Sequence, residues 1–146
     1  MLMGRPMLDP EGGARCRVSI PASPSRLAGV RRAVRAYLRG VQDEVADDVV
    51  LALNEVATNA VLYGSSGGQP VEVVVHVDDG WVEASVLDHG PVSPLGLPAD
   101  TDELRAGGWG LWLLRRLVDE VRLERVKLGT RVTLRRAIRP AGTLAP

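Results

Sequence analysis

Glu55 and Asn59 are the first residues whose types and spacing could support chemistry. They lie in the segment 43–64, where apolar residues recur at helical spacing, at Val45, Val49, Leu53, Val56 and Ala60. On a helix, a separation of four residues places both side chains on one face, about one turn apart. The carboxylate could take a proton from a hydroxyl or water, and the amide could supply a neutral oxygen to a hard cation. Taken alone, the pair is better explained as part of a solvated helix face.

Two glycine-containing stretches provide further candidates. Asp88-His89-Gly90 ends an alternating segment, so its carboxylate could accept a hydrogen bond from a ligand amino group at a sheet edge. Gly107-Gly108-Trp109-Gly110-Leu111 precedes a helical pattern, and a glycine-rich turn at a helix N-terminus suits phosphate oxygens. Neither stretch matches a P-loop or a Gly-x-Gly-x-x-Gly fingerprint. Each is weak alone, because such glycines are common in turns.

The elements that would position these residues follow from the periodicity of the chain. The pattern predicts a strand at 14–20, helices at 26–40 and 43–63, a hairpin at 71–77 and 81–87, a helix from 110, and a hairpin at 120–126 and 131–138. A long loop precedes the third helix, and such loops are usually functional. Because the strands come in hairpins, we expect an α+β two-layer sandwich: a mixed, mostly antiparallel sheet with helices on one face.

The order of the motifs resembles that of the GHKL ATPase superfamily, which has the Bergerat nucleotide-binding fold. Glu-x-x-x-Asn-Ala on a long helix is followed by Asp-x-Gly after a hairpin, then by Gly-x-Gly-Leu, then by Gly-Thr on a terminal hairpin. The resemblance covers residues 14–138, which we take as one domain between a disordered leader (1–13) and a disordered tail (139–146). Within this superfamily, the short length of the chain resembles that of the anti-sigma-factor serine kinases, which phosphorylate an anti-anti-sigma protein.

The resemblance implies a role for each motif residue. Glu55 would be the catalytic base towards the acceptor serine, and Asn59 would ligate the Mg²⁺ that bridges the ATP phosphates. Asp88 would bind the adenine amino group. The other implied nucleotide-binding residues are Gly90 and Thr130 near the adenine, and Gly108, Gly110 and Leu111 where the lid and helix start close over the phosphates. Arg105, the only cation between residues 41 and 110, is expected to contact a phosphate.

One departure from the family pattern keeps alternatives open. Relatives often continue the adenine motif as Asp-x-Gly-x-Gly, whereas Val92 stands in place of the second glycine. Glu55 favours an active kinase, while Val92 favours a non-catalytic ATP-binding module that switches between partners. A histidine-kinase catalytic domain is a third alternative, disfavoured because no upstream dimerisation helices with an acceptor histidine are present in the sequence.

Composition and charge limit the other function classes. The 146 residues are 45% hydrophobic and 25% charged with zero net charge, as in one soluble domain. Without a net basic balance, we expect no direct nucleic-acid binding. No apolar run approaches a membrane span, and the single Cys16 fits a reducing compartment, so a cytoplasmic location is expected. The implied partners are a sigma factor and an anti-anti-sigma protein, and homodimers are common in the resembled family.

Several further side chains have predicted positions. The first helix carries Arg31, Arg32, Arg35 and Arg39, a row that is either a solvated face or a surface for a protein partner. His76 is predicted to pack or face solvent, and His89 to face solvent or the base. Trp109 and Trp112 are predicted to pack in the lid and core.

Overall fold

The computed structural model describes residues 5–8, 14–64, 68–89, 110–127 and 129–138. The strands are β1 (Arg5–Leu8), β2 (Ala14–Ile20), β3 (Val71–Asp78), β4 (Trp81–Asp88), β5 (Glu120–Val126) and β6 (Gly129–Ala137). The helices are α1 (Leu27–Tyr37), α2 (Asp43–Asn59) and α3 (Gly110–Leu117), with a 3-10 turn, η1 (Pro24–Arg26), before α1 and a π-helical turn, η2 (Ala60–Gly64), after α2.

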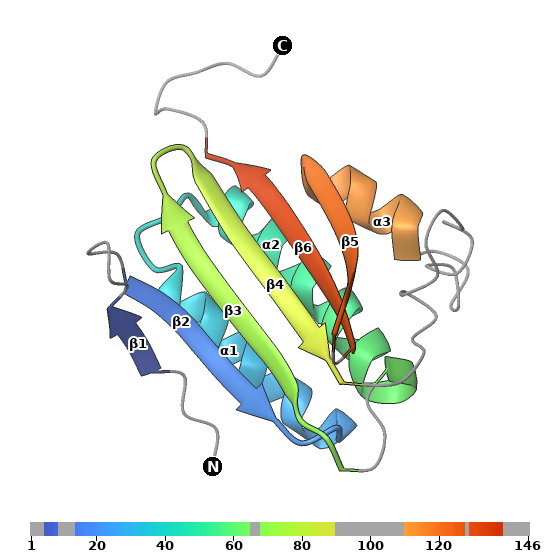
Figure 1. The fold of residues 1–146 in the computed structure, drawn as a ribbon. Helices are drawn as coiled ribbons and strands as arrows, with labels where there is room; N and C mark the ends of the chain where they lie inside the picture. Colours follow the sequence, from blue (N-terminus) through green and yellow to red (C-terminus); the bar gives the residue numbers. More distant parts are fainter. Residues whose placement is uncertain (1–4, 9–13, 65–67, 90–109, 128, 139–146) are drawn as a thin grey trace.

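The strands form one sheet in the order β1-β2-β3-β4-β6-β5, and each neighbouring pair is antiparallel. All three described helices lie on the same side of this sheet, and none of the described helices covers its other face, which we call the uncovered face (Figure 1). The predicted two-layer α+β sandwich with helices on one face is therefore confirmed. The connections β3–β4 and β5–β6 are short. Each therefore requires antiparallel pairing of the two strands that it joins, since short turns can join only antiparallel neighbours.

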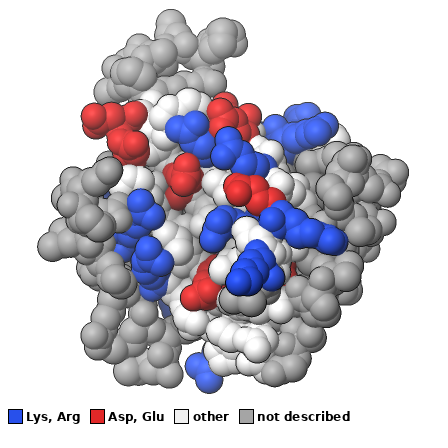
Figure 2. Space-filling model, viewed as in Figure 1, with Lys and Arg blue, Asp and Glu red and all other residues white. Residues whose placement is uncertain are grey.

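The core lies between the sheet and the helices, and it is aliphatic. Strands β3 and β4 alternate buried and less buried positions, so that Val71, Val73 and Val75 face the helices. Cys16 is buried in the same layer, and burial raises the pKa of its thiol. The uncovered face instead carries charges of both signs (Figure 2), and long side chains surround a depression of about 740 Å³ over its middle strands.

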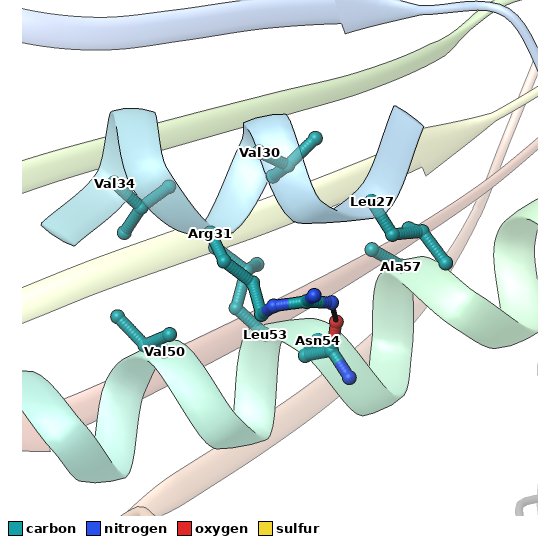
Figure 3. Close-up of a pocket in the computed structure, with 8 residues that line it drawn as sticks. All are labelled: Leu27, Val30, Arg31, Val34, Val50, Leu53, Asn54 and Ala57. Carbon is teal, nitrogen blue, oxygen red and sulfur yellow. Dashed lines mark hydrogen bonds between the residues drawn. The ribbon is translucent and has the colours of Figure 1, made fainter. Parts of the chain in front are cut away.

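Helix α2 is the central helix of the second layer. It contacts α1 and α3 as well as β4 and β6, and it buries residues along most of its length. A narrow apolar slot separates it from α1, and Figure 3 shows Arg31 reaching across this slot to Asn54. The Arg31 guanidinium donates to the Asn54 side-chain oxygen over 2.8 Å. This contact fixes α1 against the turn of α2 that also carries Glu55.

The structure corrects the expected leader and refines two element ends. Arg5–Leu8 forms strand β1, so the prediction of a disordered leader is wrong for these four residues. They pair with the outer edge of β2, whose backbone hydrogen-bonding groups would otherwise have no strand partner. The long helix predicted to Tyr63 changes to a π-helical turn after Asn59, and β6 begins at Gly129, two residues earlier than predicted. No helix in the described ranges is long and apolar enough to cross a membrane.

Candidate functional site

Asp88 and Thr130 form the buried part of the candidate site. They are directly opposite each other, at the end of β4 and the start of β6. Asp88 is only 2% exposed and Thr130 only 3%, and they are the only polar side chains in the buried class among the described residues. Burying a carboxylate is costly unless hydrogen bonds satisfy it. The sheet thus ends in a sheltered acceptor and hydroxyl, the groups that a heterocyclic amine can hydrogen-bond.

Gly129 allows the two strand ends to come together. A Cβ atom built on Gly129 would overlap the backbone carbonyl oxygen of Asp88 and lie 2.9 Å from the Cα of His89. Any larger residue would therefore push β6 away from the backbone at Asp88. Sequence reasoning selected Thr130 but not Gly129. The Gly-Thr dipeptide could have indicated Gly129. Its close approach to the Asp88 backbone, however, results from the pairing of β4 with β6, which cannot be read from the sequence.

His89 connects the end of β4 to the neighbouring strand. Its Nε2 atom lies 3.1 Å from a carboxylate oxygen of Glu72 on β3, and its side chain is 17% exposed. The prediction that His89 faces solvent or the base is therefore incomplete, because the ring is half-buried against Glu72. This contact restrains the backbone directly after Asp88. Glu72 was missed in the sequence because its closeness to His89 depends on strand register.

Glu55 and Asn59 lie on the last turns of α2, and both are half-buried. Their separation of one turn confirms the predicted common helix face. The chain then enters η2, which contacts β4, the strand that ends in Asp88. Figure 1 shows the end of α2, the end of β4 and the start of β6 at the same end of the molecule. π-Helical turns are rare and occur frequently at functional sites.

The end of α2 with Glu55 and Asn59 therefore lies at the same end of the molecule as Asp88 on β4 and Thr130 on β6. Gly110 begins α3, which contacts α2 and β5, and Leu111 is its second residue. Gly90, Arg105 and Gly108 lie outside the described residues, as do Val92 and Trp109, so their predicted roles stay predictions. The core-packing prediction for Trp112 is wrong: its side chain is 55% exposed, and the Arg116 guanidinium lies 4.9 Å from its ring centroid.

The donors available at this end of the molecule suit a magnesium nucleotide better than a metal ion alone. Among the described residues, no group of three or more His, Cys, Asp or Glu side chains could hold a metal ion. Asn59 offers one neutral oxygen, so a hard cation would need further oxygens from a ligand, such as phosphates. The buried Asp88 carboxylate, beside the Thr130 hydroxyl, fits a heterocycle with an amino group.

Comparison with known proteins identifies the family of this chain. Residues 20–136 match the family described as the histidine kinase-like ATPase domain. The chain belongs to this family. It is 30% identical over 123 residues to the serine-protein kinase RsbW of Bacillus pumilus, and 28% identical over 120 residues to RsbW of Listeria innocua. Each alignment covers 73% of this chain and 76% of the relative.

Two solved structures share the fold. The RsbU and RsbW domains of a Mycobacterium tuberculosis protein superpose with a TM-score of 0.65 at 27% identity, over 92% of this chain and 35% of that one. This chain therefore spans about a third of that solved structure. The SiaB–SiaC complex of Pseudomonas aeruginosa superposes with a TM-score of 0.54 at 22% identity, over 84% of this chain and 89% of that one, which shows likeness of fold alone.

Proposed function

We propose that this protein is an ATP- and Mg²⁺-dependent serine kinase that also acts as an anti-sigma factor. It phosphorylates an anti-anti-sigma protein and sequesters a sigma factor until the unphosphorylated anti-anti-sigma protein competes. The likeness to RsbW serine-protein kinases supports the kinase part of the proposal. Both partners are inferred from the family that the sequence resembles, in which homodimers are common.

One observation carries the proposal most directly. The end of α2, with Glu55 and Asn59, lies at the same end of the molecule as the buried pair of Asp88 and Thr130. A nucleotide held by its base at Asp88 and Thr130 would direct its phosphates towards Asn59. Phosphoryl transfer needs positioning, charge neutralisation and an oriented nucleophile more than covalent chemistry by the protein.

The chain's own residues divide these tasks. The Asp88 carboxylate accepts a hydrogen bond from the adenine amino group, and Thr130 supplies a hydroxyl beside it. The side-chain oxygen of Asn59 would hold the magnesium ion, which would supply positive charge to the phosphates. Glu55 accepts the proton of the attacking serine hydroxyl, as a general base within reach of the transferred group. Arg105, Gly108, Gly110 and Leu111 are proposed to close over the phosphates.

Transfer of labelled γ-phosphate from ATP tests this function. The wild type is incubated with Mg²⁺ and with each anti-anti-sigma protein encoded in the same genome, beside Glu55→Gln and Asn59→Ala. We expect one substrate serine to be labelled by the wild type and by neither variant. Labelling of a histidine would instead identify a histidine kinase, and unchanged labelling by Glu55→Gln would exclude Glu55 as the base.

Val92 favours a second candidate function, a partner-switching module that binds ATP without transferring phosphate. A valine in place of the second motif glycine narrows the conformations open to the segment after Gly90. ATP-dependent binding of a partner without labelling of any substrate would support this candidate. Replacing Val92 with glycine would then be expected to increase nucleotide affinity.

A further inference from the structure

A basic groove lies at the other end of α2 from the candidate site. It is lined by the C-terminal half of α1, the connection to α2, and the first turn of α2, and it holds about 440 Å³. Its walls carry Arg32, Arg35 and Arg39, and Val41 contributes apolar surface, while Leu38 and Ala46 line it as buried residues. These features define what we call the α1 groove. A groove with cationic walls and apolar side chains suits an amphipathic ligand better than a free anion.

The charges of the α1 groove are incompletely neutralised. Helix α1 contains no acidic residue, so its arginines can pair only with groups from other elements. The Arg35 guanidinium lies 2.6 Å from the Asp47 carboxylate, and both side chains are more than half exposed. Within the part of the chain that the structure describes, Arg32 and Arg39 have no ion-pair partner. Two exposed guanidinium groups are therefore available to a ligand.

The positions of these two arginines define the ligand further. Arg32 lies within α1, whereas Arg39 lies two residues after Tyr37, where α1 ends. We propose that the α1 groove binds an acidic segment of a protein partner, with two carboxylates that flank an apolar side chain. The carboxylates pair with Arg32 and Arg39. The apolar side chain packs against Val41, which is partly exposed in the groove.

A protein segment suits this groove better than a continuous polyanion. Asp43 lines the groove, and Glu44 and Asp47 are exposed on the same end of α2. These carboxylates would repel a nucleic-acid backbone or an anionic membrane, on which negative charge is unbroken. A partner segment can place a neutral or basic side chain opposite them.

The inference about the α1 groove rests on the proposed function, since it assigns a docking surface to the protein partners proposed for the kinase. Helix α2 has 17 residues, so the groove lies roughly 25 Å from the Asn59 end. A partner held at the groove would gain affinity without touching the groups that react. Such a surface can raise the effective concentration of a substrate segment at the candidate site.

A defined peptide tests the groove directly. It carries two glutamates that flank a leucine, and a scrambled peptide of the same composition is the control. We expect the designed peptide, at about 50 mM salt, to shift the amide NMR signals of Arg32 and Arg35–Val41. The scrambled peptide should bind about tenfold more weakly. Equal shifts by both peptides, or stronger shifts by anionic vesicles or duplex DNA, would overturn the proposal.

Charge-matched variants separate the groove from general electrostatics. Arg32→Glu with Arg39→Glu is expected to weaken peptide binding about tenfold or more, with unchanged ATP affinity. Arg17→Glu with Arg122→Glu makes the same change in net charge on the uncovered sheet face, where both side chains are exposed, and should weaken binding less than about threefold. Similar losses in the two double variants would show that no specific groove exists.

The kinase assay gives a second readout. With a substrate that the wild type phosphorylates, Arg32→Glu with Arg39→Glu should raise KM about tenfold and leave kcat unchanged. A fall in kcat with unchanged KM would contradict docking at the groove. If the wild type phosphorylates nothing, the proposed function fails, while the peptide measurements still decide whether the groove binds acidic segments.

Discussion

The two ends of α2 differ in how far the charged side chains around them are buried. In the candidate site at its C-terminal end, Asp88 is almost completely buried and Glu55 and Asn59 are half-buried. At its N-terminal end, the α1 groove displays exposed arginines over apolar surface. Buried polar groups are held in one geometry by the surrounding strands, whereas exposed arginines keep side-chain freedom and are screened by salt.

This difference separates chemistry from recognition. Groups that must act on particular atoms need fixed positions and low exposure to water, as at the end of β4. Groups that select a partner need only complementary charge at an accessible place, as on α1. Substitutions at the C-terminal end should therefore cause large and salt-insensitive losses, and substitutions at the N-terminal end small and salt-sensitive ones.

The largest expected effect is on catalysis at Glu55. Replacing Glu55 with glutamine removes the base but keeps the size of the side chain, so kcat for phosphoryl transfer should fall by about 10²- to 10⁴-fold. ATP affinity should stay within about threefold, because the base does not hold the nucleotide. Glu44→Gln, at the exposed start of the same helix, is the matched control and should keep its full rate. If Glu55→Gln is as fast as this control, Glu55 is not the catalytic base.

The next largest effect is on nucleotide affinity at Asp88. Asp88→Asn replaces one acceptor oxygen with a donor, and the loss of a hydrogen bond to a charged group costs about 1.5–3 kcal/mol. The dissociation constant for ATP should rise about 10- to 150-fold in calorimetry. Asp79→Asn, in the exposed β3–β4 turn, makes the same chemical change away from the site and should bind ATP as the wild type does. Equal affinities would mean that Asp88 has only a structural role.

Much of this arrangement was predictable from the sequence because it depends on local patterns. The helix face shared by Glu55 and Asn59, the two hairpins and the single helical layer follow from periodicity and turn residues. The strand β1 was not predictable, because Arg5–Leu8 has a strand partner only once β2 is in place. The contact of His89 with Glu72 and the approach of Gly129 to Asp88 were hidden for a similar reason, since both depend on strand register.

Gly129 offers a test of whether strand register or side-chain chemistry holds the candidate site together. Gly129→Ala forces β6 away from the Asp88 carbonyl, so we expect a loss of about 1–3 kcal/mol in the free energy of unfolding, measured in urea. ATP affinity should also fall, because Asp88 and Thr130 separate.

Gly40→Ala provides the control for this variant. Gly40 has a φ of +102° and open space around it, near the start of α2, so its substitution adds backbone strain without an overlap. Lower stability with normal ATP affinity is expected for Gly40→Ala. The same pattern in Gly129→Ala would show that the strand contact does not position the nucleotide.

The smallest expected effect concerns the ion pair between Arg35 and Asp47. Because both side chains are largely exposed, Asp47→Asn should change the free energy of unfolding by less than about 1 kcal/mol. It also releases a third guanidinium beside the α1 groove, so affinity for the acidic peptide should rise about two- to threefold at low salt. Asp79→Asn changes net charge equally but at a distance, and should leave that affinity unchanged.

The sign of this small change distinguishes two roles for Asp47. If peptide affinity falls in Asp47→Asn, the carboxylate orders Arg35 for binding, and the groove is organised in advance as the candidate site is. If affinity rises, Asp47 only competes with the ligand, and the arginines act as a screened, adaptable surface. A rise in peptide affinity would therefore agree with the contrast between the two ends of α2. Only the reacting groups of the candidate site would then be held in a fixed geometry.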